Sequence, residues 1–338
     1  MLAVLLQLLI PALQPAPDPA DTVRLVFVGD VMMHRQQLDY DHTVFLSSIS
    51  PLLSSADIAV ANAEFTLAGK PYTGYPAFSA QDSYLNSIMD AGVDLLLTAN
   101  NHILDKGSAG LIRTLGLYEG IPTAGSGRNR QEYEANNPAI IQANGIRIAL
   151  VNFTYGTNLP QESEYPKVSR MNEDEISRQF DRARAAGADF IIALPHWGAE
   201  YVLRHNASQR RWAEYLVELG ADAVVGAHPH VVQDTCFIAG VPVIYSLGNA
   251  VSNMSAKNTR LELAAELVLI RHRVSGKTSM ERPVLHFLWC TLPGKLRDNY
   301  MTVEVERFTG RRDEWKDPSD YDNMIQTLHR VKKETGIE

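Results

Sequence analysis

Short apolar runs alternate with amphipathic stretches along most of the chain. Five runs are nearly continuous and partly β-branched, which is typical of strands covered on both faces of a sheet. They span residues 24–28, 57–60, 94–98, 189–194 and 221–225, and each gives way to Gly, Asn, Pro or His. Because open α/β sheets collect functional groups beyond the carboxyl ends of their strands, we expect polar side chains from distant segments to meet there.

Helical periodicity lies between these runs. Residues 83–90 and 108–118 are predicted helices, and the second carries apolar residues on one face. Asn172 opens a third helix with acidic residues in its first turn, and Asn206 or Ser208 can cap a fourth that stops at Gly220. This alternation of strand and helix predicts a layered α/β fold.

The last third of the chain is richer in strands. The segments 241–247, 261–270, 283–289 and 300–308 are predicted strands, and Asp317 starts a final helix. These segments suggest a second sheet or an antiparallel extension. We expect one domain over residues 23–338.

An apolar stretch from residue 2 to residue 10 opens the chain, followed by a proline-rich spacer. The stretch is far shorter than the roughly 20 residues that a membrane-spanning helix needs, and it fits the hydrophobic region of a secretory signal better. A mis-assigned start or a buried terminal segment is the alternative. We expect residues 1–22 to be a signal-like segment and spacer, and the protein to be exported and periplasmic or associated with the cell envelope.

Composition narrows the functional classes. Of 338 residues, 45% are hydrophobic, which can fill a sizeable core, and the formal net charge is −8. This negative balance argues against a nucleic-acid partner held through its phosphate backbone, because that mode of binding needs a positive face. Cys236 and Cys290 match no metal-ligand spacing; they either pair in an exported protein or stay as two free thiols.

Six short polar segments carry the candidate chemistry. They are Gly29-Asp30, Asn62-Ala63-Glu64, Asn100-Asn101-His102, Pro195-His196-Trp197-Gly198, His228-Pro229-His230 and Ser246-Leu247-Gly248-Asn249. Each alone has an ordinary structural explanation, such as a turn aspartate or a semi-buried histidine. Brought to one sheet edge, their carboxylates, imidazoles and amides would form a metal site for two ions.

His228 and His230 are the strongest single signal, because an extended His-x-His stiffened by proline directs both rings the same way. Asp30 can reach a cation from a strand end. Glu64 can bridge two cations, and an imidazole that does not ligate, such as that of His102, can donate a proton.

Four further residues are candidates for contacts with a substrate: Lys70, Trp197, Glu200 and Asn249. Lys70 could hold an anion, although an exposed lysine is more often only solvated. Trp197 would add an aromatic wall and Glu200 another carboxylate. His34, four residues after Asp30, is either a ligand or a surface histidine.

Together the six segments resemble the bacterial capsule-synthesis family of the CapA type, which is associated with poly-gamma-glutamate. The resemblance covers roughly residues 24–255. That family is similar to calcineurin-like metallophosphoesterases, so the resemblance implies a four-layer α-β-β-α sandwich with a strand-rich carboxy-terminal part.

The resemblance also implies roles for individual residues. It makes Asp30 and His230 ligands of one ion, Asn101, His196 and His228 ligands of the other, Glu64 the bridge, and His102 the proton donor. The ions would be divalent, and Mn, Fe, Zn and Co all suit such mixed nitrogen and oxygen ligands. Related phosphoesterases usually carry a histidine two residues after the first aspartate, where this chain has Met32; His34 is a candidate substitute.

Two functions follow from the resemblance. The favoured one is a metal-dependent, phosphoesterase-like hydrolase of the cell envelope, which acts on an anionic polymer, a phosphoester or an amide. It would work in capsule or poly-gamma-glutamate synthesis or processing, beside membrane-associated polymer-synthesis machinery. The alternative is a non-catalytic polymer assembly or binding component that keeps the metal site for structure.

Overall fold

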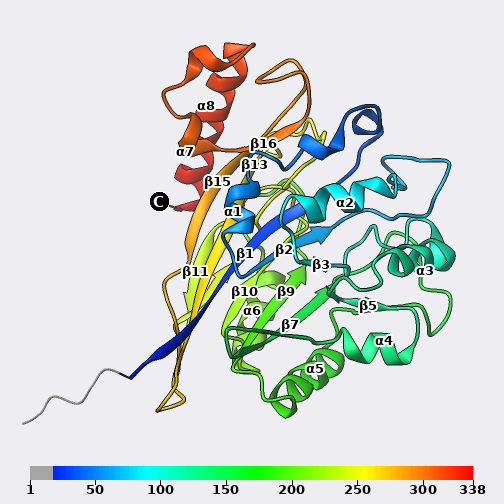
Figure 1. Cartoon of the computed structure of the whole chain (residues 1–338), viewed down its shortest axis with the longest axis vertical. Helices are drawn as coiled ribbons and strands as arrows, with labels where there is room; N and C mark the ends of the chain where they lie inside the picture. The colour runs from blue at the N-terminus through cyan, green and yellow to red at the C-terminus, as the bar shows by residue number, and fades with distance from the viewer. Residues whose placement is uncertain (1–17, 338) are drawn as a thin grey trace, which may run out of the picture.

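Two β-sheets lie against each other in the computed structural model, which describes residues 18–337 (Figure 1). The first sheet has the strand order β16-β15-β13-β1-β2-β3-β4, with β14 paired to β13, and the second has the order β11-β12-β10-β9-β7-β6. The strands of the first sheet are β1 (Ala20–Val31), β2 (Ile58–Ala63), β3 (Leu95–Leu97), β4 (Thr123–Ala124), β13 (Leu261–His272), β14 (Thr278–Met280), β15 (Val284–Thr291) and β16 (Met301–Glu304). Those of the second are β6 (Ala139–Ala143), β7 (Ile146–Thr154), β9 (Phe190–His196), β10 (Ala223–Val225), β11 (Thr235–Ile238) and β12 (Val241–Ile244). A small separate pair joins β5 (Ser126–Gly127) to β8 (Lys167–Val168).

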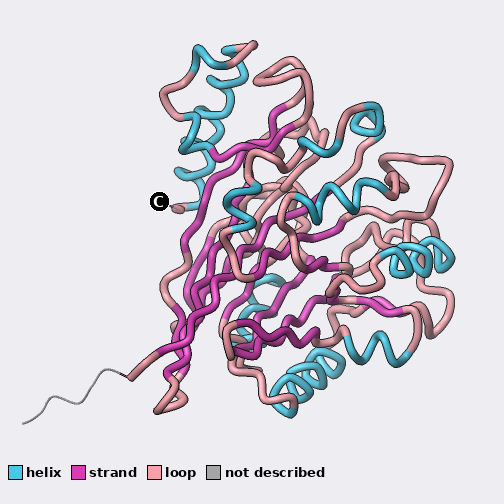
Figure 2. The backbone as a smooth tube through the Cα atoms, viewed as in Figure 1, coloured by secondary structure: helices cyan, strands magenta, loops and turns pink. Residues whose placement is uncertain are grey.

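Helices cover the outer faces of both sheets and lie at the periphery of the strands (Figure 2). The helices α1 (Ser50–Ser54), α2 (Ser83–Asp90) and α3 (Gly107–Leu117) pack on the first sheet, and α5 (Glu173–Ala185) and α6 (Ala207–Glu218) pack on the second. The others are α4 (Arg130–Ala135), α7 (Val305–Phe308) and α8 (Pro318–Thr335), the last of which contributes to the core between the sheets. The predicted four-layer α-β-β-α sandwich is therefore confirmed.

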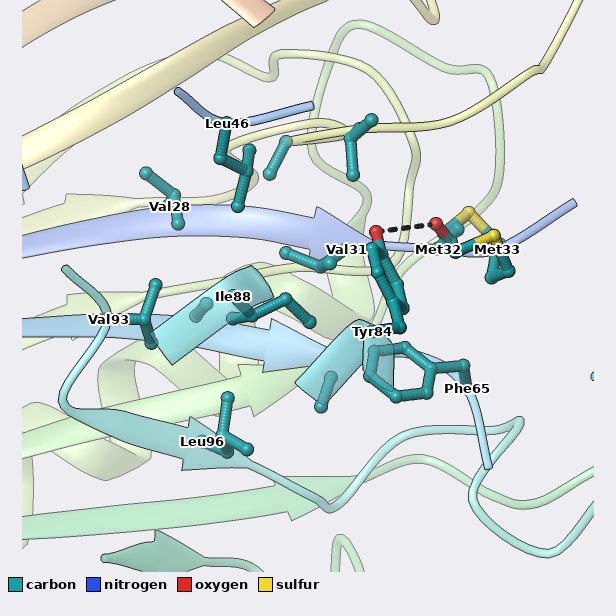
Figure 3. Close-up of a cluster of buried hydrophobic side chains, with 14 of the residues drawn as sticks. Val28, Val31, Met32, Met33, Leu46, Phe65, Tyr84, Ile88, Val93 and Leu96 are labelled. Carbon is teal, nitrogen blue, oxygen red and sulfur yellow. Dashed lines mark hydrogen bonds between the residues drawn. The ribbon is translucent and has the colours of Figure 1, made fainter. Parts of the chain in front are cut away.

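Side-chain alternation along β1 divides the core into layers. Leu25 and Phe27 face the second sheet, whereas Val26 and Val28 face the helices, as the two-residue period of a strand requires. On the helix side, the buried hydroxyl of Tyr84 donates a hydrogen bond of 3.1 Å to the carbonyl oxygen of Met32 (Figure 3). This bond ties α2 to the segment that follows β1.

The two sheets are joined by backbone hydrogen bonds at the end of β1. The Asp30 N–H donates to the Gly248 carbonyl at 2.9 Å, and the Met32 N–H donates to the Val251 carbonyl at 3.0 Å. Gly248 and Val251 follow β12 of the second sheet. The ends of strands from both sheets therefore meet at one seam.

A register shift between Val28 and Asp30 in the pairing of β1 with β2 marks a bulge at this seam. The N–H of Gly29, inside the bulge, donates at 2.8 Å to Oε1 of Glu262, a wholly buried residue of β13. A Cβ atom at Gly29 would lie 1.9 Å from the Gly248 carbonyl oxygen. Only glycine fits this crossing without displacing the backbone.

The predicted strands and helices are confirmed with one main exception. All five apolar runs contain strands, α2 spans the predicted residues, and the Asn172 and Asn206 side chains accept the expected capping hydrogen bonds. The predicted strand 300–308 is wrong in its second half, because α7 begins at Val305. The β6–β7 hairpin was not predicted.

The amino-terminal prediction falls mostly outside the described residues, which begin at residue 18. Within the predicted spacer, Ala20 already pairs with His272 of β13. No helix in residues 18–337 is long and apolar enough to cross a membrane. Cys236 and Cys290 are both free thiols in this structure.

We expect Gly29→Ala to lower the free energy of unfolding by about 2–3 kcal/mol, because the added Cβ would have to push the seam apart. Urea denaturation with an unchanged slope measures this loss. Gly156→Ala is the matched control, since its Cβ would meet nothing within 4 Å. A loss at Gly29 no larger than that at Gly156 would contradict the tight seam.

Candidate metal centre

Two wholly buried carboxylates lie at the seam. Asp30 follows the bulge in β1, and Glu64 comes directly after β2. The Asn62 side-chain amide donates to Asp30 Oδ1 at 2.7 Å and to Glu64 Oε2 at 3.4 Å. One amide group therefore holds both carboxylates.

Three imidazoles surround the other Glu64 oxygen. The Nε2 atoms of His230, His196 and His102 lie 3.8, 3.9 and 4.0 Å from Glu64 Oε1. His196 ends β9, His230 follows β10 and His102 follows β3. The predicted convergence of segments from both sheets is therefore present, and all three rings are buried.

His228 and His230 are not extended, which corrects the expected conformation. Both adopt positive φ angles, of 100° and 57°, which non-glycine residues rarely take up outside sites that over-determine them. The His228 N–H donates to Asp30 Oδ2 at 3.3 Å, and His230 Nδ1 lies 3.2 Å from the same oxygen. Their common partner Asp30 orients this turn.

Burial and charge set the protonation of the cluster. Burial raises the pKa of Glu64 well above its usual value, and the charge of Asp30 raises it further. Burial also raises the pKa of Asp30, but the hydrogen bond from His230 and the neighbouring histidines outweigh it and leave that pKa well below normal. Burial lowers the pKa of His228 to about 3 and that of His196 well below its usual value. His196 and His228 are therefore neutral imidazoles, the form that ligates metals.

The donor atoms fit divalent cations. Within residues 18–337, Glu64 Oε1 and His228 Nδ1 are buried without a hydrogen-bond partner, which is costly for a carboxylate oxygen. Ligand atoms within 4.8 Å of one another come from Glu64, His228 and His230 in one group, and from Asp30, Glu64 and His196 in another. Glu64 belongs to both groups, which suits a bridging carboxylate. The groups place His230 with His228 and Asp30 with His196, which differs from the expected division of the ligands between two ions.

Asparagines support this cluster. Asn101 Oδ1 lies 2.8 Å from His196 Nε2, so the predicted amide ligand adjoins an imidazole of the centre. Asn100, whose role was not predicted, donates from its amide to Asn62 Oδ1 at 3.2 Å and to the Ala63 carbonyl at 2.9 Å. Asn100 thus fixes the amide that holds the carboxylates.

His102 has a carboxylate partner on the side away from Glu64. Its Nδ1 lies 2.6 Å from Asp105 Oδ2, and Asn158 Nδ2 donates to Asp105 Oδ1 at 3.4 Å. Asp105 thereby directs His102 Nε2 towards the centre. Asn158 was not predicted, since it lies in an irregular loop after β7 without a recognisable pattern.

Two of the residues expected around a substrate are buried instead. Asn249 Oδ1 lies 2.8 Å from His230 Nδ1 and orients that ring. Trp197 is wholly buried between the second sheet and its helices, where its indole N–H donates to the Tyr245 carbonyl at 2.9 Å. Trp197 therefore packs the core and forms no aromatic wall.

The other two candidates are on the surface. Glu200 is exposed and close enough to Glu64 to raise its pKa. Lys70 is exposed beside Lys106 and Arg113, in a shallow depression formed by the loop after β2 and the start of α3. Their roles stay predictions.

His34 and Met32 occupy positions outside both ligand groups. His34 Nδ1 accepts a hydrogen bond from the Asn253 N–H at 3.2 Å, and burial lowers the pKa of His34 to about 4. Met32 is wholly buried in the apolar cluster of the first sheet (Figure 3). A core methionine thus stands where a histidine ligand was considered.

Two exposed tyrosines that were not predicted lie against the histidines. The ring centroid of Tyr155 is 4.6 Å from that of His228, and Tyr201 is 6.2 Å from His230. Tyr155 follows β7, whose hairpin was missed, so the sequence pattern carried no signal for it.

Comparison with known proteins identifies relatives by sequence. The family described as "Bacterial capsule synthesis protein PGA_cap" matches residues 24–254. The chain is 28% identical to capsule biosynthesis protein CapA of Bacillus anthracis, over 71% of this chain and 62% of that protein. It is 27% identical to PGA biosynthesis protein CapA of Bacillus subtilis (strain 168), over 71% of this chain and 66% of that protein. The chain thus spans less than two thirds of the length of these relatives.

Solved structures share the fold at low sequence identity. A putative 5'-nucleotidase from Staphylococcus aureus has a TM-score of 0.55 at 13% identity and covers 78% of this chain and 54% of its own. Calcineurin-like phosphoesterase YfkN from Bacillus subtilis has a TM-score of 0.50 at 13% identity, covering 94% of this chain and 98% of its own. The fold is therefore of the metallophosphoesterase type.

We expect excess Mn²⁺ to raise the melting temperature relative to EDTA-treated protein, with a stabilisation of about 2.7 kcal/mol per site at a hundredfold excess over Kd. Glu64→Gln should lose most of this gain, because the shared carboxylate is gone. The metal-free variant should be at least as stable as the metal-free native protein, since a buried acid is removed. Calorimetry and elemental analysis measure both effects.

The matched control is Glu218→Gln, which changes an exposed carboxylate on α6. It should keep the full metal-dependent gain. Equal stabilisation of Glu64→Gln and Glu218→Gln by Mn²⁺ would contradict the role of Glu64.

Proposed function

The chain belongs to the family of bacterial capsule synthesis proteins (PGA_cap), and from this premise we propose that it is a metal-dependent, phosphoesterase-like hydrolase of the cell envelope. Its role would be the synthesis or processing of an anionic polymer of the poly-gamma-glutamate type. The names of the two CapA relatives support the polymer, and the phosphoesterase-type fold supports hydrolysis.

The observation that carries the proposal is the unpartnered oxygen of Glu64 among three imidazoles. Two divalent ions, drawn from Mn, Fe, Zn or Co, would be held by Asp30, Glu64, Asn101, His196, His228 and His230. Such ions supply Lewis acidity and lower the pKa of a bound water. Neutral imidazoles with anionic and amide oxygens are suitable ligands for all four metals.

The residues of the chain provide the proton transfer. With Asp105 holding Nδ1–H of His102, the opposite nitrogen, Nε2, points to the centre and lies 4.0 Å from Glu64 Oε1. There it can hold a proton and deliver it to the oxygen of a leaving group. Burial of the pair excludes water, and the fixed partner Asp105 holds the ring in the orientation that directs Nε2 to the centre.

The fixed positions of the two carboxylates also favour catalysis. Asn62 and Asn100 form a buried amide chain that fixes Asp30 and Glu64 before any ligand arrives. Groups held in place in this way need no reorganisation during reaction, which is the main source of electrostatic catalysis.

A second candidate function is a polymer assembly or binding component with a structural metal site. The observation that favours it is Met32, whose core position removes a histidine that related phosphoesterases usually have. Export and contact with membrane-associated polymer-synthesis machinery belong to both candidates, with the apolar stretch 2–10 as the signal-like segment.

We expect the Mn²⁺-loaded native protein to hydrolyse phenyl phosphate, whose phenolate leaving group is basic enough to need a proton. His102→Ala should lower kcat by about 10²–10⁴-fold, because it removes the proton donor but no proposed ligand. Steady-state kinetics measures this, with metal content and circular dichroism as checks on the variant.

His329→Ala, at an exposed histidine of α8, is the control and should keep full activity. Hydrolysis by His102→Ala at the native rate would reject its proposed role. Absence of hydrolysis by a fully metal-loaded native protein would favour the non-catalytic candidate.

A further inference from the structure

Two tyrosines lie beside the imidazoles of the candidate centre. The ring centroids of Tyr155 and His228 are 4.6 Å apart, those of His228 and His230 are 5.8 Å apart, and those of His230 and Tyr201 are 6.2 Å apart. Tyr155 is also nearly parallel to His196, at an interplanar angle of 10°. Each tyrosine thus lies beside one of the two histidines of the candidate centre.

These tyrosines differ from the histidines in exposure. Tyr155 and Tyr201 are 49% and 46% exposed, whereas His228 and His230 are 3% and 1% exposed. Large rings gain stability by burial, so half-exposed rings beside a buried polar site leave apolar faces available to a ligand.

The backbone holds both rings at the site. The Tyr155 N–H donates to the His196 carbonyl at 3.0 Å, and the Tyr201 N–H donates to the Pro229 carbonyl at 2.8 Å. Tyr201 has a φ of 66°, in the left-handed region that a bulky non-glycine residue rarely adopts. Such conformations concentrate at ligand sites, and here the exposed ring gains little packing in return.

We propose that Tyr155 and Tyr201 form a ring-binding subsite, which takes the sugar or aromatic ring that bears the phosphoryl group of a phosphoester. The subsite rests on the proposed function, because the phosphoryl group must lie at the metal centre for its ring to reach the tyrosines. It adds a substrate class, ring-bearing phosphoesters, in preference to phosphoesters of short acyclic alkyl groups.

The negative charge of Glu200 near the subsite is compatible with an uncharged ring on the ligand. Glu200 is exposed and precedes Tyr201 in the chain. Its negative charge disfavours a second anionic group beside Tyr201 but leaves an uncharged ring unaffected. The faces of tyrosine rings stack on planar groups and on the C–H faces of sugars, whereas a short alkyl chain leaves most of their area uncovered.

The test compares two phosphonates, whose C–P bond is not hydrolysed, so that binding is measured without turnover. We expect phenylphosphonate to bind the Mn²⁺-loaded full chain about tenfold more tightly than methylphosphonate in calorimetry. The combined variant Tyr155→Ala with Tyr201→Ala should reduce this ratio to near one without changing the affinity for methylphosphonate. The corresponding Tyr→Phe variant should keep the ratio, because it keeps both rings.

Phe237→Ala is the matched control, since Phe237 is a 54% exposed aromatic residue on β11. It should leave the ratio unchanged. Equal affinity of the native protein for the two phosphonates overturns the subsite, as does a full ratio in the double alanine variant or an equal loss in Phe237→Ala. Failure of both phosphonates to bind metal-loaded protein overturns the phosphoryl site, and with it both the proposed function and the subsite.

Discussion

Two buried carboxylates accept hydrogen bonds from the same side-chain amide, and the rest of the site depends on this arrangement. Asp30 and Glu64 share Asn62 and are wholly removed from water. Two like charges so close in a buried site cannot both be ionised unless positive groups compensate them. The surrounding features follow from this need: His230 at Asp30, the imidazoles around Glu64, and an oxygen left open to a cation.

This constraint also explains why the site lies between the sheets. Neither sheet alone could enclose two acids, because its strand ends would be open to solvent on one side. The hydrogen bond from the Asp30 N–H to the Gly248 carbonyl joins the two sheets. The carboxylate of Glu262, on β13, accepts a hydrogen bond from the Gly29 N–H and fixes the neighbouring residue. A shift of the two sheets at the seam would move Asp30. The geometry of the site therefore depends on how the sheets pack against each other.

Much of the fold and the set of residues at the centre could be predicted from the sequence, because apolar runs ending in polar residues mark the carboxyl ends of strands. The sequence could not show on which side of the sheet each polar or aromatic residue lies. His196 and Trp197 are neighbours, and successive side chains at a strand end point to opposite faces, so one enters the site and the other the core. Asn249 was misplaced for a related reason: its partner His230 is distant in sequence and becomes visible only in three dimensions.

The long antiparallel pairing of β1 with β13 has a consequence for how the chain can be divided. Residues 24–254 contain every proposed ligand and match the family, yet β13 pairs with β1 from Ala20 to Phe27 and begins only at Leu261. A fragment trimmed to the matched region would leave β1 as an open sheet edge with unpaired amides, a template for self-association. The region that matches the family is thus shorter than the shortest fragment suited to recombinant expression.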